Sequence, residues 1–325
     1  MADNLAVSFA DIEEAASRIE GHVRLTPLLR SDDLDRRAGG QVLLKAECLQ
    51  ETGSFKLRGA MNHVLSLPSD RKERGVVAYS SGNHAQGVAR AAKRAGIPAV
   101  IVMPADAPKA KRQRTEDDGA EVVTYDRERE SREEIGQRIA EERGATLIPP
   151  YDHPKTIAGQ GTAGLELAHD AGGTLDQVLI CCSGGGLAAG VGLAVRQKMP
   201  NAEIIVVEPQ GFDDTGRSLA AGQKVTNGRL TGSICDALLA PAPGDYTLPI
   251  LKSLGASGVS VSDEEVLAAM RYALFELKLT LEPGGAVALA AVLKGRVPTK
   301  GRRTAVLLSG GNCDPETLRA ALNHS

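Results

Sequence analysis

The chain has 325 residues, of which 42% are hydrophobic and 36 are glycines, and this composition is typical of an α/β enzyme with a sizeable core. Its 38 lysines and arginines against 41 aspartates and glutamates give a net charge of −3, so neither nucleic acid nor an anionic membrane is expected as a partner. No apolar run reaches the roughly 18 residues of a membrane span, and the first residues lack the pattern of a secretion signal, so we expect a cytoplasmic protein.

Short β-rich runs alternate with longer helical patterns along the chain. The runs are residues 42–47, 76–80, 99–104, 121–126, 146–151, 177–183, 203–209, 258–262 and 304–311. Helix starts are marked by Ser8 with Asp11, by Pro108 and by Ser262. Continuous apolar strands separated by helices indicate parallel sheets covered on both faces. Cys181 and Cys182 lie in one such run and are expected to be core residues.

The block from 71 to 149 has strand–helix units of its own. We therefore predict a small αβ domain over 71–149, inserted into a large domain made of residues 1–70 and 150–325. In open α/β sheets, ligands bind beyond the carboxyl ends of the strands. A ligand is thus expected in the crevice between the two domains.

The stretch ETGSFKLRGAMN at 51–62 contains a lysine in an unusual setting. Lys56 is surrounded by apolar positions, whereas a solvated lysine usually lies on the outer stripe of a helix. A partly buried amine must be either paired or reactive. The stretch by itself leaves both possibilities open.

A glycine-rich loop directly follows the run that ends near residue 182. Ser183, Gly184, Gly185, Gly186 and Leu187 lead from that strand into a helix. Such a loop offers free backbone N–H groups and the positive end of the helix dipole, which suit a phosphate. The spacing matches neither a P-loop nor a dinucleotide fingerprint, so a single phosphate on a small cofactor is favoured. A tight strand-to-helix turn is the alternative.

Two further polar loops follow strands in the same manner. Residues 80–87 follow the strand at 76–80, and residues 309–312 end the last strand. The first loop is able to hold a carboxylate at a helix N-terminus, although a simple turn, with His84 as a packed or capping histidine, is the alternative. Three such loops together with an isolated buried lysine indicate one ligand site.

Several motifs, in this order and spacing, resemble the fold-type II pyridoxal-phosphate enzymes, specifically the serine/threonine dehydratase and serine racemase branch. They are SFKLRGA (54–60), SSGNHAQG (80–87), AGQGT (158–162), SGGGLAAG (183–190), LEPGGA (281–286) and LSGGN (308–312). The resemblance covers nearly the whole chain. It implies an α/β fold of two open, twisted, mostly parallel sheets with the active site in the crevice between them. The regulatory domain of biosynthetic threonine dehydratases is expected to be absent. Dimers are the commonest oligomers, so a homodimer is expected.

The same resemblance implies how pyridoxal 5′-phosphate is held. Lys56 would be the Schiff-base lysine, and Phe55 would pack against the pyridine ring. Asn83 would bond the ring hydroxyl, residues 183–187 would bind the phosphate, and Ser309 would face the pyridine nitrogen.

The implied activity is removal of the β-hydroxyl and amino groups of L-threonine or L-serine, which yields a 2-keto acid and ammonia. Ser80, Ser81, Gly82, Asn83 and His84 would hold the substrate carboxylate. Ser81 also matches the second acid/base of serine racemases, so racemisation is one alternative. Arg132 matches an arginine able to reach a second carboxylate, which makes 3-hydroxyaspartate another substrate candidate; a solvated helix arginine is the competing interpretation.

Two further hypotheses remain at this point. Glu208 and Asp214, with the carbonyl of Phe212, match the spacing of a hard-cation site in this branch, which implies Mg²⁺ or Ca²⁺; acids in a surface turn are the alternative. The chain departs from the branch at Tyr79, often histidine in racemases, and at residues 235–249, so a remodelled pocket wall is expected. A non-catalytic sensor of a phosphorylated ligand would not need Lys56.

Overall fold

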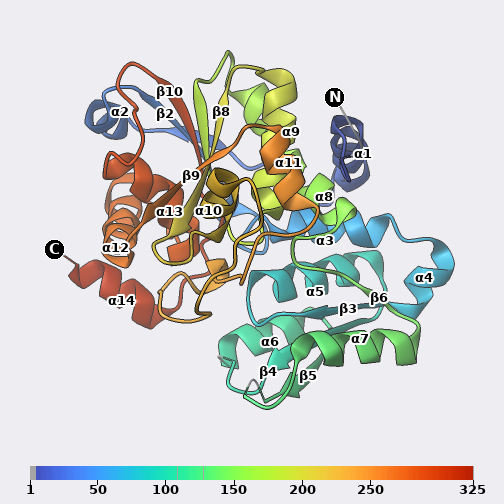
Figure 1. Ribbon diagram of the computed structural model, residues 1–325. Helices are drawn as coiled ribbons and strands as arrows, with labels where there is room; N and C mark the ends of the chain where they lie inside the picture. Colours follow the sequence, from blue (N-terminus) through green and yellow to red (C-terminus); the bar gives the residue numbers. More distant parts are fainter. Residues whose placement is uncertain (1–4, 108, 127, 325) are drawn as a thin grey trace.

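Two open sheets organise the protein, and helices pack on their faces (Figure 1). The computed structural model describes residues 5–107, 109–126 and 128–324. The six-stranded sheet has the order β1 (Leu28–Arg30), β2 (Gln41–Lys45), β10 (Arg303–Leu307), β7 (Gln177–Cys181), β8 (Glu203–Pro209) and β9 (Ser257–Val261). The four-stranded sheet has the order β5 (Glu121–Tyr125), β4 (Ala99–Pro104), β3 (Val76–Tyr79) and β6 (Thr146–Leu147). Within these sheets, only β1 and β2 pair in the antiparallel sense.

The helices connect the strands and cover the sheets on both sides, as parallel sheets require. They are α1 (Phe9–Ile19), α2 (Asp32–Ala38), α3 (Lys56–Leu65), α4 (Ser69–Arg74), α5 (Asn83–Ala95), α6 (Lys109–Asp117), α7 (Arg132–Arg143), α8 (Pro154–Asp170), α9 (Gly186–Lys198), α10 (Asp214–Ala221), α11 (Thr247–Ser253), α12 (Asp263–Tyr272), α13 (Pro283–Leu293) and α14 (Pro315–Asn323). Short 3₁₀ turns lie at η1 (Glu47–Leu49) and η2 (Asp236–Leu238), and a π-helical turn, η3 (Ala273–Leu277), follows α12.

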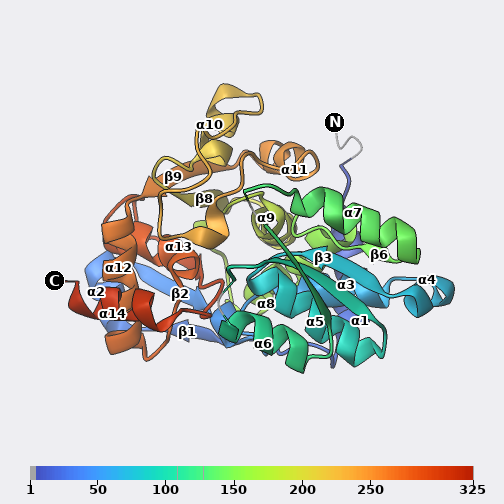
Figure 2. The same ribbon diagram turned by 90° about the horizontal axis from the view of Figure 1, so that it is seen from below.

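Successive strand residues of the small sheet point to opposite helices, because side chains alternate along a strand. Val76 and Ala78 of β3 join the apolar cluster under α5, whereas Val77 joins the cluster under α7. In the large sheet, α13 lies on one face and α9 on the other (Figure 1). Figure 2 shows the two sheets side by side, and α3 links them by packing on both α5 and α8.

The β-rich runs of the sequence all contain strands, so the mostly parallel α/β architecture is confirmed. The run at 146–151 is a strand for only two residues, because Pro149 and Pro150 lack the N–H that a ladder needs. The strand β1 was not predicted from the sequence, because an edge strand of three residues is too short to show a recognisable hydrophobic pattern.

The predicted helix starts at Ser8 and Ser262 are confirmed as capping boxes. Pro108 lies outside the described residues. The helix from Ser262 changes to the π form after Tyr272 and ends at Lys278, whose φ is 59°. No helix in the described part of the chain is long and apolar enough to cross a membrane.

Candidate active site

The lysine singled out by the sequence stands at the first residue of α3. Its Nζ donates a hydrogen bond of 2.7 Å to the carbonyl oxygen of Pro150 and lies 5.2 Å from the centre of the Phe55 ring. Burial lowers the pKa of Lys56 to about 8, although the nearby Cys181 and Glu282 act in the opposite direction. A desolvated amine with a lowered pKa is partly neutral near neutral pH, and is therefore available as a nucleophile or base.

The glycine loop between β7 and α9 presents its N–H groups to the crevice. In the part of the chain that the structure describes, the N–H groups of residues 184–187 have no hydrogen-bond acceptor. The loop is fixed through the Gly184 carbonyl, which accepts bonds from the Gly244 N–H (3.1 Å) and the Thr247 hydroxyl (2.7 Å). Gly185 has a φ of 92°, a conformation that favours glycine. Free N–H groups at a helix N-terminus fit a phosphate.

Tyr151 forms a wall of this loop, and the sequence reasoning did not identify it. A Cβ atom added at Gly184 would lie 2.2 Å from the Tyr151 ring, so only glycine fits there. The next residue, Asp152, accepts hydrogen bonds from the N–H groups of residues 245–247 and so fastens the wall. The sequence did contain a feature that could have pointed to Tyr151 and Asp152: both are polar residues between a short strand and α8.

The second loop also ends in free N–H groups. Helix α5 begins at Asn83 without a side-chain cap, and the N–H groups of residues 83–85 have no acceptor within the described ranges. The Ser80 hydroxyl accepts a bond from the Gly82 N–H at 3.1 Å, which shapes the turn. Ser81 is partly exposed between these residues. A carboxylate is the ligand that suits such a helix start.

The ring of His84 is hydrogen-bonded to the backbone and is not free to bind a substrate. Its Nε2 pairs with the carbonyl oxygen of Ile148 at 2.8 Å, and burial beside Lys56 lowers the pKa of His84 to about 3. A neutral ring with its Nε2 occupied gives no cation to a substrate carboxylate. The backbone N–H of His84 is the group that remains available.

Asn83 is oriented by two residues that the sequence reasoning did not place at the site. Its Nδ2 donates to Glu282 at 2.6 Å, and its Oδ1 accepts from Asn312 at 2.7 Å. An amide nitrogen carries two hydrogens, so one N–H of Asn83 is left for a ligand. Burial raises the pKa of Glu282 to about 7. Glu282 and Asn312 lie in the motifs LEPGGA and LSGGN, and these motifs could have indicated from the sequence that both residues belong to the site.

Ser309 lies at the floor of the same site. The residue is 4% exposed, and its carbonyl oxygen accepts the Phe55 N–H at 3.1 Å, which ties the end of β10 to the loop that carries Lys56. Cys181, expected only as a core residue, has its thiol hydrogen-bonded to Ser309. Burial raises the pKa of that thiol to about 11, so it is neutral.

The residues brought together fit pyridoxal phosphate. The Lys56 amine is bonded to Pro150, and the next residue, Tyr151, packs on the glycine loop with the free N–H groups of residues 184–187. Glu282, which orients Asn83, also acts on the charge of this amine. In the segment that precedes Lys56, the buried hydroxyl oxygens of Thr52 and Ser54 have no partner among the described residues. Unpaired buried polar atoms are rare in native proteins and commonly mark a missing ligand or water.

The candidate cation residues also lie together, away from Lys56. Both oxygens of Glu208 accept backbone N–H groups, from Thr215 (3.1 Å) and Gly216 (2.8 Å). Asp214 accepts from Asn227 through one oxygen, and its other oxygen, Oδ2, is buried without a partner within the described residues. Burial and the neighbouring Asp214 raise the pKa of Glu208 to about 8.

Two buried acids with an unpaired oxygen fit a hard cation. The described residues hold no cluster of three or more His, Cys, Asp or Glu side chains suited to a metal. A cation at Glu208 and Asp214 would therefore need the carbonyl of the buried Phe212 as a further ligand.

Arg132 begins α7 near the mouth of the crevice. Its Nε pairs with Glu133 at 2.8 Å, and its guanidinium lies 5.7 Å from the centre of the Tyr79 ring. About half of the side chain is exposed, at 49%. Arg132 also acts electrostatically on Tyr151, the wall of the glycine loop. Its position thus combines a surface ion pair with proximity to the site.

Comparisons with known proteins bear on this geometry. The family model of the pyridoxal-phosphate dependent enzymes matches residues 19–310. An L-threo-3-hydroxyaspartate ammonia-lyase from Pseudomonas sp is 42% identical, with 97% of this chain and 98% of that protein covered. The structure of maize serine racemase matches with a TM-score of 0.92 at 38% identity, and the match covers 98% of this chain and 97% of the maize chain. The structure of a serine racemase from Dictyostelium discoideum matches with a TM-score of 0.89 at 36% identity, and the match covers 95% of this chain and 99% of the Dictyostelium chain. The chain belongs to the pyridoxal-phosphate dependent enzyme family.

Proposed function

We propose that this protein is a pyridoxal-phosphate-dependent ammonia-lyase that converts a small L-β-hydroxy amino acid, L-threonine or L-serine, to the 2-keto acid and ammonia. The observation that carries the proposal is the Lys56 amine, which is desolvated and bonded to the carbonyl of Pro150, the residue before Tyr151 at the glycine loop. The start of α5, with its free N–H groups, lies close enough to Lys56 for the lysine to lower the pKa of His84. Relatives that act on threonine and on 3-hydroxyaspartate support the reaction class.

Each part of the site has a role in this reaction. The cofactor, when bound, supplies the electron sink. The N–H groups of residues 184–187 would bind its phosphate, and Lys56 would hold the cofactor and take the Cα proton of the substrate. The start of α5 would orient the substrate carboxylate. Ser309, placed by resemblance at the ring nitrogen, would not keep that nitrogen protonated as an aspartate does, and this would favour loss of the β-hydroxyl.

A substrate panel tests the proposal. Keto-acid release is measured with L-threonine, L-serine, both 3-hydroxyaspartate diastereomers and phenylserine. We expect a yellow protein whose colour is bleached by borohydride and which releases keto acid from at least one of these compounds. A protein that stays colourless when pyridoxal phosphate is added, and that releases no keto acid from any of these compounds, would instead support a sensor of another phosphorylated ligand.

A second candidate substrate is 3-hydroxyaspartate, and Arg132 is the observation that favours it. The guanidinium lies 5.7 Å from the centre of the Tyr79 ring, and its charge opposes the rise in the pKa of Tyr151 at the glycine loop. A second substrate carboxylate is the group we propose it pairs with. Loss of one such charged bond is expected to raise KM about tenfold or more.

The variant Arg132→Gln tests this role, with Arg138→Gln as the matched control. Arg138 lies on the same helix and pairs with Glu142 at the surface. If Arg132 binds a second carboxylate, Arg132→Gln raises KM for 3-hydroxyaspartate but leaves KM for threonine and serine nearly unchanged. Equal effects on all substrates, or none, would assign Arg132 to the solvated helix surface.

We further propose that Glu208, Asp214 and the Phe212 carbonyl bind Mg²⁺ or Ca²⁺. The unpaired Asp214 oxygen and the raised pKa of Glu208 support this site, because a nearby cation would stabilise both carboxylates. The site lies behind the glycine loop, since the Thr215 hydroxyl donates to the Ser183 carbonyl at 3.2 Å. A homodimer remains a prediction, based on the general frequency of dimers among oligomers.

A further inference from the structure

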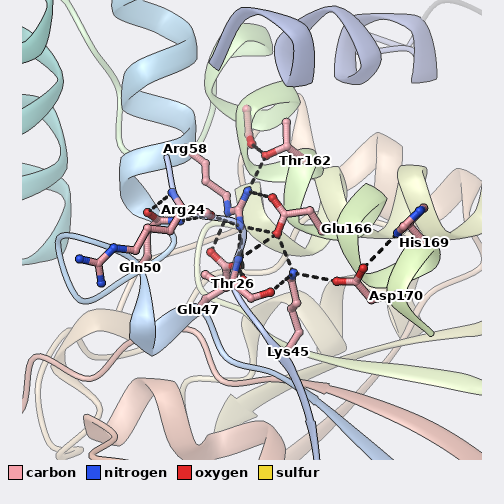
Figure 3. A network of polar contacts seen from close by, with 11 residues as sticks. Arg24, Thr26, Lys45, Glu47, Gln50, Arg58, Thr162, Glu166, His169 and Asp170 are labelled. Carbon is pink, nitrogen blue, oxygen red and sulfur yellow. Dashed lines mark hydrogen bonds and ion pairs between the residues drawn. The ribbon is translucent and has the colours of Figure 1, made fainter. Parts of the chain in front are cut away.

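A network of buried charges surrounds Arg58, which follows Lys56 by two residues in α3 (Figure 3). The guanidinium of Arg58 is completely buried. It forms paired bonds to Glu47 (Nε to Oε2 2.8 Å, Nη2 to Oε1 2.9 Å) and to Glu166 (Nη1 to Oε1 2.5 Å, Nη2 to Oε2 2.8 Å). A further bond runs from Nη1 to the Thr162 hydroxyl at 3.2 Å. All of the donor nitrogens of the fork are thus in use.

The two glutamates come from different parts of the chain, and this determines what Arg58 holds. Glu47 lies in η1, before the loop of residues 50–55, and Arg58 lies after that loop in the same helix as Lys56. The Glu47–Arg58 pair therefore clasps the segment 47–58 at its two ends, and Lys56 lies within this segment. Glu166 belongs to α8, so the second pair fixes this segment to the helix that follows the Pro150 connection.

The charges of the network are balanced by a second buried cation. Lys45 is 0% exposed and donates to Glu166 (2.6 Å) and to the Thr26 carbonyl (2.7 Å). Asp170, which is partly exposed, lies 3.8 Å from the same amine. Burial opposes the charge of Arg58, but Glu47 and Glu166 raise the pKa of Arg58 above its ordinary value. Arg58 therefore stays charged.

Stability alone does not account for this arrangement. Desolvation makes a buried ion pair costly, and apolar residues of similar volume often replace one without loss of stability. The positive N-terminal end of a helix is also unfavourable for a cation, and yet Arg58 lies in the first turn of α3. What a planar fork with paired bonds does provide is fixed geometry.

We propose that Arg58 is a positioning residue for Lys56: its paired bonds to Glu47 and Glu166 hold the start of α3 at the depth that buries the lysine amine. The inference rests on the role proposed for Lys56. It assigns the arginine of the SFKLRGA motif a role in the reaction without contact to the substrate or cofactor. A displacement of about 1 Å of a catalytic group can lower the rate about 100-fold.

Two variants separate positioning from stability. Arg58→Lys keeps the charge but loses the fork. The triple variant Thr26→Val, Glu47→Leu, Arg58→Met removes the Glu47–Arg58 clasp together with the Thr26 hydroxyl that donates to Glu47, and it leaves Glu166 paired with Lys45. The surface pair Arg143–Glu121, which also has paired bonds, gives the matched control Arg143→Met, Glu121→Leu.

Three quantities are measured for each variant. Thermal unfolding reports stability, and kcat and KM report function in the holoenzyme. The pKa of Lys56 in cofactor-free protein is obtained from the pH dependence of amine labelling, with the labelled peptide read by mass spectrometry. We expect the control to match the wild type in all three.

For Arg58→Lys and the triple variant, we expect the Lys56 pKa to move from about 8 toward its ordinary value of 10.5, because the amine is less deeply buried. We also expect kcat to fall about 100-fold with a smaller change in KM. An unchanged Lys56 pKa in both variants overturns the proposal, as does a loss of activity that merely follows the unfolded fraction. A wild type that neither bleaches with borohydride nor releases keto acid would instead overturn the proposed function.

Discussion

Lys56 and Pro150 are joined by a hydrogen bond of 2.7 Å, although 94 residues separate them in the chain. The bond links the start of α3 to the connection that leaves the small sheet after β6 and enters α8. The neighbouring carbonyl of Ile148 is bonded in the same way to His84, at the start of α5. One short connection therefore contacts both the reactive amine and the loop proposed to bind the substrate carboxylate.

Replacement of Lys56 by methionine should abolish turnover and should also change how stability depends on pH. The pKa of Lys56 is about 8 in the folded, cofactor-free protein and 10.5 as its ordinary value. Between these pH values the unfolded state binds more protons, so wild-type stability rises with pH there, and below pH 8 the buried charge costs stability. Lys56→Met should be more stable than the wild type below pH 8, and the gain should shrink as pH rises. Thermal unfolding of both proteins over a pH series checks this; a gain that is constant with pH would contradict it.

A methyl group at Gly185 should weaken cofactor binding. The residue has a φ of 92°, and a Cβ atom there would lie 2.8 Å from the Thr247 hydroxyl oxygen, so the loop must shift. Gly222, with a φ of 69° and no atom near its Cβ position, gives the control. Both Gly→Ala variants should lose about 1–2 kcal/mol of stability through backbone strain. Only Gly185→Ala should raise the pyridoxal-phosphate Kd, by about tenfold or more, as measured by absorbance titration. A similar Kd for both variants would remove the loop from the phosphate site.

Replacement of Ser81 should separate elimination from racemisation. Elimination from an L-amino acid needs one base, Lys56, on one face of the cofactor, whereas racemisation needs a proton delivered to the other face. We expect Ser81→Ala to abolish D-serine formation and any reaction of D-serine, while elimination from L-substrates survives. Chiral product analysis measures both. A wild type that makes D-serine faster than pyruvate would identify a racemase, and a variant that still racemises would exclude Ser81 as the second base.

Removal of a divalent cation should destabilise the protein if Glu208 and Asp214 bind one. A ligand that binds only the folded state, at about 100 times its Kd, stabilises it by about 2.7 kcal/mol. Magnesium should therefore raise the melting temperature of chelator-treated wild type but not that of Asp214→Asn. Asp213→Asn is the control, because Asp213 pairs with Arg217 near the surface. Identical melting curves with chelator and with magnesium would remove the cation from the site.

Local signals predicted much of the fold. Continuous apolar, β-rich runs found β2 to β10, and the capping residues Ser8 and Ser262 placed the starts of α1 and α12. These features depend on neighbouring residues only. The edge strand β1 was missed because three residues are too few to show a pattern, and its pairing with β2 is a tertiary contact. The π turn after Tyr272 was missed as well.

At the site, the sequence alone was enough to identify the candidate functional groups, namely the amine of Lys56 and the N–H groups of the glycine loop. A lysine in apolar surroundings, a glycine loop at a helix start and the succession of motifs identified the family and the candidate residues around Lys56. Folding brought together the groups that meet there, namely Tyr151 with Gly184, Glu282 with Asn83, and the Arg58 clasp. Motifs and caps are recognised within a few residues, because they depend on local geometry. Burial, pKa values and hydrogen-bond partners depend instead on segments far apart in the chain, which become neighbours when the two sheets and α3 pack together.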